Sequence, residues 1–250
     1  MGMYVVSHKE LKNKFPKGYK TIIVNANYND VKGDLYDNVG DNISKKNRSF
    51  CELTAIYWLW KNSTDDYIGI DHYRRFFVDG ESLLPVDKAK GIVENGFVIV
   101  PQKETFTKKM GTLYWSTSGY KHDLTVVRNS IIKIDPEYLK DFYYFLKQNS
   151  MYCYNMSVMK RDMFDNYCEW LFAILEDTEQ SLDMEQKGAE NRRSYYKRIY
   201  GFIAERLLNV FLIHNNIEVK ELPIKFTGKK PSLALRIKNK LNKIKDKYIG

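Results

Sequence analysis

DDYIGIDHYRRFF, residues 65–77, contains a short apolar run that leads directly into charged side chains. The run Tyr67–Ile70 is bounded by polar residues, which is typical of a buried strand, although so short a run is ambiguous by periodicity alone. In open α/β sheets, ligands bind just beyond the carboxyl ends of such strands. We therefore expect this strand to deliver four polar side chains to a ligand site: Asp71, His72, Arg74 and Arg75.

Arg74 and Arg75 favour an anionic ligand at that site. An Arg guanidinium is a planar, charged fork whose N–H groups match phosphate oxygens. The alternative is that both arginines form ordinary ion pairs with Asp65, Asp66 or Glu52, because charged strand ends are also common at surfaces. Spacing alone favours neither interpretation.

Strand-like and helix-like patterns alternate along the chain. Strands are predicted at 4–7, 21–25, 67–70, 97–100, 153–159 and 218–222. Amphipathic helical stripes begin near Leu53, Leu139, Phe164 and Ile199. This alternation predicts an α/β fold with a mainly parallel sheet flanked by helices.

Two local features accompany these elements. Ser49 and Glu52 have the spacing of a capping box, so we expect Glu52 to stabilise the start of a helix. The stretch 177–194 is charged and poor in apolar residues, which predicts a surface loop.

The net charge of +9 is concentrated at the C-terminus. Residues 229–250 hold eight basic residues and one acidic residue, so they carry +7 and residues 1–228 carry +2. A nucleic-acid-binding domain usually carries a basic surface patch, whereas residues 1–228 are nearly neutral, so no nucleic-acid partner is expected. The chain is therefore divided into a domain at 1–228 and a basic tail at 229–250.

The tail has the pattern of an amphipathic helix over 231–248. One stripe is apolar and consists of Ile237, Leu241, Ile244 and Tyr248. Basic residues fill much of the remaining circumference, which predicts binding to an anionic membrane surface. The alternative is a solvated helix that packs on its own domain or on a partner.

The sequence also indicates the compartment. It shows no signal peptide, and its longest apolar run, Leu207–Ile213, is too short to span a bilayer. The three cysteines, Cys51, Cys153 and Cys168, lie in apolar patterns without metal-type spacing. A cytoplasmic protein is expected.

Several common motifs are absent from the sequence. It contains no glycine-rich phosphate loop, no paired Cys/His zinc pattern and no Gly-x-Ser-x-Gly elbow. It also lacks the Asp-x-Asp with which many nucleotide-sugar transferases hold a divalent cation. Since arginines can neutralise a diphosphate leaving group, we expect no metal cofactor. The alternative is Mn²⁺ or Mg²⁺ held by Asp71 and His72.

Other polar residues are candidates for the site, each with a structural alternative. His8 and Lys9 follow the first predicted strand, where a loop can meet a nucleotide. Asn42 and Asn47 carry groups that can read a base or ribose, or that simply shape a turn. Asn155 lies in a predicted strand and can bind a sugar hydroxyl or a backbone group.

Three further residues lie on predicted helices. His122 and Asp123 open one helix, where they are either site residues or caps. Glu205 lies inside an apolar helix, and a buried carboxylate must be paired or functional. An internal pair with Arg206 is expected.

Ordered motifs in this sequence resemble a bacterial glycosyltransferase family. They are DNIS at 41–44 with Asn47, CELTAIYWLWKN at 51–62 and HYRRFF at 72–77. Similar segments are SHK at 7–9, NMSVM at 155–159, YCEWLF at 167–172 and GFIAERLL at 201–208. The family was long catalogued as a domain of unknown function in capsular, exopolysaccharide and O-antigen gene clusters. The resemblance covers residues 3–225.

The resemblance implies a GT-A-like fold, a nucleotide-sugar donor and a growing-glycan acceptor. Characterised relatives include a galactofuranosyltransferase domain without the usual metal motif, which makes UDP-galactofuranose one donor to consider, beside galactose donors. Asp71 departs from the family, which favours a small or apolar residue before the His.

Residues and resemblance together predict a cytoplasmic glycosyltransferase, peripheral at the inner membrane face, that extends a lipid-linked polysaccharide. The competing hypothesis is a non-catalytic nucleotide- or sugar-binding protein of the same fold. The expected donor-binding residues are His8, Lys9, Asn42, Asn47, His72, Arg74 and Arg75, with the two arginines on the diphosphate. The expected acceptor-binding residues are His122 and Asn155, and the catalytic base is Asp71, Asp123 or Glu205.

Overall fold

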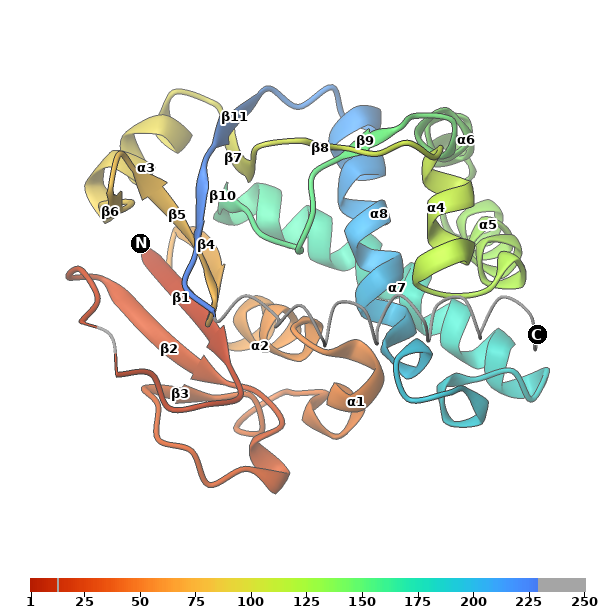
Figure 1. The fold of residues 1–250 in the computed structure, drawn as a ribbon, viewed down its shortest axis with the longest axis horizontal. Coiled ribbons are helices and arrows are strands. Elements are labelled where there is room, and N and C mark those ends of the chain that lie inside the picture. The colour runs from red at the N-terminus through yellow and green to blue at the C-terminus, as the bar shows by residue number, and fades with distance from the viewer. Residues whose placement is uncertain (13, 229–250) are drawn as a thin grey trace.

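A mixed sheet forms the centre of the computed structural model, which describes residues 1–12 and 14–228 (Figure 1). Its main path has the strand order β11-β7-β10-β4-β1-β2-β3. These strands are β11 (Val219–Leu222), β7 (Val98–Pro101), β10 (Val158–Lys160), β4 (Tyr67–His72), β1 (Gly2–Ser7), β2 (Tyr19–Ile23) and β3 (Leu35–Tyr36). All neighbours pair in parallel except β10, which is antiparallel to both β4 and β7.

Shorter strands extend this sheet or lie apart from it. β5 (Arg75–Asp79) forms a hairpin with β4 and also pairs with β6 (Ser82–Leu83) and β12 (Ile224–Phe226). β8 (Glu104–Thr105) and β9 (Ser150–Met151) form a separate two-stranded ribbon. The predicted α/β class with a mainly parallel sheet is confirmed.

Helices cover both faces of the sheet. They are α1 (Asn47–Phe50), α2 (Leu53–Asn62), α3 (Val86–Glu94), α4 (Met110–Thr117), α5 (Lys121–Ile134), α6 (Leu139–Leu146), α7 (Arg161–Met184) and α8 (Ile199–His214). The larger core joins one face to α2, α7 and α8, and a smaller core lies under α3 on the other face. Alternation along β1 explains the division, because Tyr4 and Val6 enter the larger core whereas Met3 enters the smaller one. Figure 1 shows α4, α5, α6 and α8 grouped beside the sheet.

Three local predictions are wrong. The strand expected at 153–159 shortens to β10, because Tyr154 and Asn155 have left-handed backbone with φ of 77° and 52°. The capping box is absent: α1 ends at Phe50, and no side-chain bond caps α2. The loop expected from residue 177 begins only after Met184, because Thr178 and Leu182 keep the end of α7 buried.

The predicted basic helix and the tail at 229–250 lie outside the described residues. Within 1–12 and 14–228, none of the helices combines the length and apolar content that crossing a bilayer requires.

Asp71 lies inside β4, and its side chain is fully buried. Its Oδ1 accepts the Phe77 N–H at 3.0 Å across the β4–β5 hairpin, and Oδ2 has no partner among the described residues. Burial raises the pKa of this carboxyl well above its ordinary value, and the Phe77 hydrogen bond offsets only part of that effect. A carboxylate without access to solvent cannot reach an acceptor, so the prediction of Asp71 as catalytic base is wrong.

Asp71→Asn should relieve a pH-dependent destabilisation. The raised folded-state pKa means that the folded protein binds more protons than the unfolded chain, so Asp71 lowers stability as pH rises above its unfolded pKa. Asn keeps an acceptor for the Phe77 N–H without the charge. Relative to wild type, D71N should therefore gain unfolding free energy progressively as the pH rises above about 4, the ordinary pKa of an Asp carboxyl. Urea unfolding at increasing pH measures it.

The matched control is Asp66→Asn, at an exposed Asp that directly precedes β4. Its effect should not change with pH. A D71N effect that is equally independent of pH would contradict the prediction.

Candidate functional site

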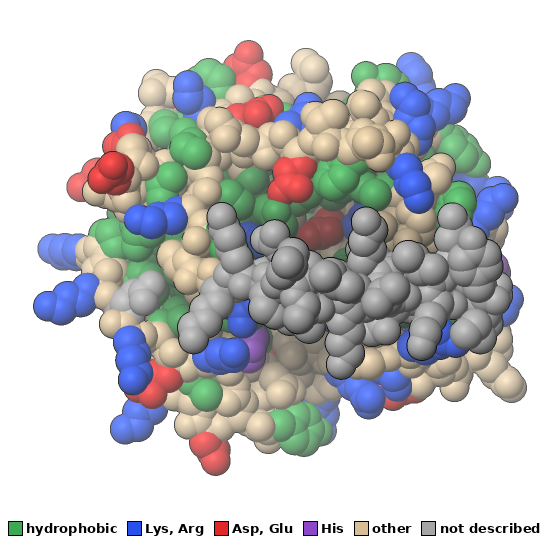
Figure 2. All heavy atoms as spheres, in the orientation of Figure 1, with side chains coloured by type: hydrophobic (Ala, Val, Ile, Leu, Met, Phe, Trp, Pro, Cys, Tyr) green, Lys and Arg blue, Asp and Glu red, His purple; other side chains and the backbone are tan. Residues whose placement is uncertain are grey.

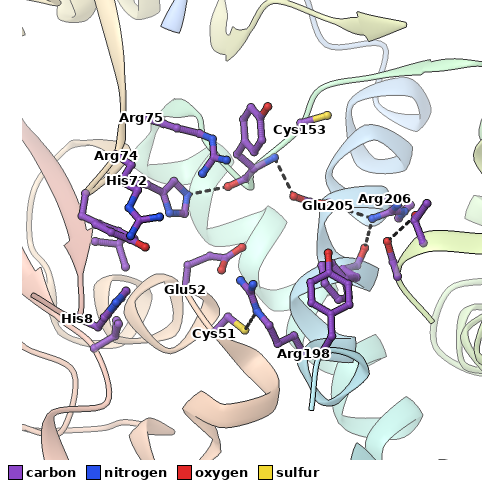
Figure 3. Close-up of a pocket in the computed structure, with 18 of the residues that line it drawn as sticks. His8, Cys51, Glu52, His72, Arg74, Arg75, Cys153, Arg198, Glu205 and Arg206 are labelled. Atoms are coloured by element: carbon purple, nitrogen blue, oxygen red, sulfur yellow. Dashed lines mark hydrogen bonds and ion pairs between the residues drawn. The ribbon is translucent and has the colours of Figure 1, made fainter. Parts of the chain in front are cut away.

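A pocket of about 960 Å³ opens where β1, β2 and β4 end, at their shared carboxyl edge. The residues that directly follow or end these strands line it: His8, Asn25 and the stretch 72–75. The opposite wall comes from the α1–α2 junction and from α8 (Figure 3). Figure 2 shows a histidine and neighbouring Lys or Arg side chains near the middle of one face. Of the four polar residues expected here, His72, Arg74 and Arg75 line this strand-end pocket and Asp71 does not.

Three arginines in the pocket are supported by aromatic rings. The guanidinium carbon of Arg74 lies 4.7 Å from the centre of the Tyr73 ring, and that of Arg75 lies 4.1 Å from the Tyr154 ring. Arg198 lies 5.6 Å from the Phe202 ring. Stacking of this kind orients a guanidinium while its N–H groups stay available to a ligand.

None of the three arginines forms an ion pair with a carboxylate within 1–12 and 14–228. Arg198 Nε donates instead to the Cys51 thiol at 3.2 Å. Asp65, one of the partners considered above, is bound by the N-terminal amino group and the Tyr4 hydroxyl. The geometry therefore favours the anion-binding interpretation over ordinary ion pairs.

The two histidines contribute hydrogen-bonding groups to the pocket. Burial lowers the pKa of both His8 and His72, and neighbouring cations lower that of His8 further. His72 Nε2 donates to the Tyr154 carbonyl at 2.7 Å, and the His8 ring packs edge-on against Tyr73. The fixed positive charge of the pocket at neutral pH therefore lies on its arginines.

Three glutamates line the same pocket. Glu205 accepts the Tyr154 N–H at 3.0 Å on Oε1 and Arg206 Nη1 at 3.0 Å on Oε2, which confirms the expected pair with Arg206. Burial raises the pKa of Glu205, and the nearby Glu52 carboxylate adds to that shift. Glu104 accepts the Tyr154 hydroxyl proton.

Glu52 has a different role from the one the sequence predicted. It precedes α2 without capping it, and its side chain turns into the pocket (Figure 3). Oε1 accepts from Asn155 Nδ2 at 2.7 Å. The capping-box spacing of Ser49 and Glu52 favoured a structural role for Glu52. The one sequence signal for a site role was that Glu52 belongs to the motif at 51–62.

The remaining donor-binding candidates divide into two groups. Asn47 lines the pocket, where its amide donates to the Cys51 carbonyl at 2.7 Å and so shapes the wall. Lys9 and Asn42 do not line it. Asn42 forms the turn expected as its alternative, since Oδ1 accepts the Ser44 N–H at 3.2 Å.

Asp123 and His122 lie away from the pocket, beside a separate cavity of about 320 Å³. Asp123 is buried and binds Arg192 through both oxygens, at 2.7 and 2.9 Å, while capping α5. His122 Nε2 lies 2.5 Å from a Glu185 carboxylate oxygen. The structure therefore contradicts Asp123 as a catalytic base and His122 as an acceptor-binding residue.

Asn155 does not face an acceptor either. Its side chain is 2% exposed and binds Glu52 and the Gly201 carbonyl from behind the pocket wall. Sequence reasoning missed the residues that complete the wall from distant segments: Glu104, Tyr154, Tyr195 and Arg198.

No group of three or more His, Cys, Asp or Glu side chains in the part of the chain described here is arranged to hold a metal ion.

Comparison with solved structures finds a similar protein. The structure titled "WbbM bifunctional glycosytransferase apo structure" matches with a TM-score of 0.81 and 29% sequence identity. The match covers 93% of this chain and 47% of the other, so this chain spans about half the length of that protein. A search of the curated proteins finds no match. The mainly parallel α/β sheet with flanking helices is therefore shared with part of a structure titled as a bifunctional glycosyltransferase.

One family model covers most of the chain and agrees with the motifs at 41–62 and 72–77. It is the domain of unknown function DUF4422, and it matches residues 2–216. Every strand from β1 to β10 and all of the pocket lining except Phe226 fall within the matched region. The chain belongs to the DUF4422 family.

Proposed function

We propose that this protein is a glycosyltransferase that moves a sugar from a nucleotide-sugar donor to a glycan acceptor. One observation carries the proposal: Arg74, Arg75 and Arg198 converge on a strand-end pocket and have no carboxylate partner among the described residues. The similarity to a structure titled as a bifunctional glycosyltransferase supports it.

The arginines suit a diphosphate leaving group. Charge that develops on departing oxygens is stabilised most by donors already oriented in a site that excludes water. Aromatic rings orient the guanidiniums of Arg74 and Arg75 before a ligand binds. Because the pKa values of His8 and His72 are lowered, the positive charge available to the phosphates is that of the arginines. A UDP-sugar, with galactofuranose or galactose, is the donor we propose.

The pocket has room for both substrates. Its volume of about 960 Å³ is near the upper end of the roughly 300–1,000 Å³ typical of small-molecule sites. His8 lies toward the sheet edge that we assign to the nucleotide, and Glu205 lies on α8, on the side that we assign to the sugars, with Glu52 between them (Figure 3). We propose a lipid-linked glycan of capsule, exopolysaccharide or O-antigen synthesis as the acceptor.

Removing a pocket arginine should impair transfer. Arg74→Ala, Arg75→Ala and Arg198→Ala should each lower the rate of sugar transfer by about 10–1,000-fold, because each removes a charged donor from the leaving group. UDP release from a panel of UDP-sugars measures the effect, and the melting temperature shows whether each variant is folded.

The matched control is Arg128→Ala, since Arg128 lies on α5 outside the pocket and binds Asn129. It should keep wild-type activity. Normal turnover by all three pocket variants would contradict the assignment, and tight UDP-sugar binding without any turnover would favour a non-catalytic binding protein.

Turnover should not depend on a metal ion. We propose that arginine charge replaces the divalent cation, so activity should survive EDTA at a concentration that removes bound Mn²⁺ and Mg²⁺. Loss of activity on chelation, restored by either cation, would instead assign a metal to the donor diphosphate.

The basic tail should bring the enzyme to its acceptor at the inner face of the cell membrane. Basic residues near an anionic surface contribute about 1 kcal/mol each, so the full chain should co-sediment with phosphatidylserine vesicles more strongly than residues 1–228 alone. Neutral phosphatidylcholine vesicles are the control. Equal sedimentation of both proteins with anionic vesicles would remove this role from the tail.

A further inference from the structure

We propose that Glu52 is the catalytic base that removes the proton from the acceptor hydroxyl, a role that rests on the proposed glycosyltransferase function. It is one of three glutamates that line the pocket, and both its hydrogen bonds and its position distinguish it from the other two.

The hydrogen bonds of the three glutamates differ. Both oxygens of Glu205 are engaged, one by the Tyr154 N–H and the other by Arg206. Glu104 is bound by the Tyr154 hydroxyl at the β8 side of the pocket. Glu52 is held through Oε1 alone, while Oε2 has no hydrogen-bond partner among the described residues and is not a buried unsatisfied atom. Glu52 and Glu104 are thus the two anchored carboxylates with an oxygen left for a substrate, and their positions distinguish them. Glu104 lies on β8, whereas Glu52 lies between the pocket arginines (Figure 3).

The position of Glu52 places that oxygen among the ligand-binding groups. Its carboxylate is close enough to His72, Arg198 and Glu205 to affect the pKa of each. Figure 3 shows it between the arginines of the β4–β5 hairpin and Arg198 on the opposite wall. A base here lies beside the proposed diphosphate site, where the sugar to be transferred would be attached.

Strained backbone surrounds this carboxylate. Cys51, directly before Glu52, has φ of 54°, and Asn155, which binds Glu52, has φ of 52°. Such conformations cost non-glycine residues about 1–3 kcal/mol and persist where the surrounding structure enforces them, often at functional sites. Cys51 ends α1 and turns the chain toward α2, and Glu52 directly follows this turn and lines the pocket.

Asn155 restrains Glu52 without neutralising it. Its Nδ2 bridges Glu52 Oε1 at 2.7 Å and the Gly201 carbonyl at 3.1 Å, which fixes the amide in one orientation. An amide donor carries no formal charge, so this contact places no cation beside the carboxylate. Asn155 is therefore a positioning residue for Glu52.

The proposed step is a single displacement at the anomeric carbon. The acceptor oxygen forms a bond to that carbon as Glu52 Oε2 takes its proton, and the bond from the carbon to the diphosphate oxygen breaks. The electron pair leaves on the diphosphate, beside Arg74, Arg75 and Arg198. The configuration at the anomeric carbon is inverted, and the proton on Glu52 is then released to solvent.

Glu52→Gln tests the assignment, because Gln keeps an acceptor for Asn155 and removes the basicity. With the UDP-sugar that wild type turns over fastest and octyl galactoside as acceptor, E52Q should lower kcat by about 10²–10⁴-fold. Its affinity for UDP, measured by calorimetry, should stay near the wild-type value. The acid-side fall of kcat in a pH profile should be present in wild type and absent from the residual activity of E52Q.

Two variants complete the experiment. Glu169→Gln, on the exposed side of α7 outside the pocket, should match wild type. Glu205→Gln should keep the acid-side fall of kcat. If E205Q abolishes that fall while E52Q retains it, or if E52Q keeps wild-type kcat with normal UDP affinity, the assignment is overturned.

The product separates the remaining outcomes. NMR should show an anomeric configuration opposite to that of the donor, and retention would overturn the proposed step. Failure of wild type to release UDP from every donor would overturn the proposed function and this inference with it, whereas an active wild type with an active E52Q overturns the inference alone.

Discussion

The pocket depends on a short turn with left-handed backbone at Tyr154 and Asn155. The Tyr154 N–H binds Glu205, its carbonyl binds His72 and its ring lies under Arg75. Asn155 then holds Glu52. Two adjacent residues thus connect groups from the sheet edge, from the α1–α2 junction and from α8, so the two walls of the pocket are fixed relative to each other.

This turn is maintained by the strand that follows it. Met156 and Val158 are fully buried in the smaller core, and β10 is inserted antiparallel between β4 and β7. Burial of an apolar side chain contributes about 1.5–3 kcal/mol, enough to offset the strain of a left-handed residue. The antiparallel strand in an otherwise parallel sheet therefore has a consequence for the site: it brings residues 154 and 155 to the ligand-binding edge.

A buried ion pair fixes the other wall. Asp123 and Arg192 are almost completely excluded from solvent, and they anchor the irregular segment between α7 and α8 to the start of α5. That segment carries Tyr195 and leads to Arg198, both of which line the pocket. Removing one partner of a buried pair typically costs about 3–5 kcal/mol, so the segment has little freedom to leave this position. Asp123 supports the site from outside instead of acting in it.

The sequence by itself determined the class of fold, the family and the strand end that forms the site. Those features depend on local patterns: the alternation of strands and helices, the ordered motifs, and the charged residues after Ile70. The tertiary structure decided which carboxylates reach the pocket. Asp71 and Asp123 belong to conspicuous polar clusters but are buried, whereas Glu52 resembles a helix cap and faces the pocket. The direction of a side chain depends on strained turns and on partners about a hundred residues away, such as Asn155 for Glu52. Neither the turns nor the partners leave a local pattern in the chain, and only the folded protein brings them together.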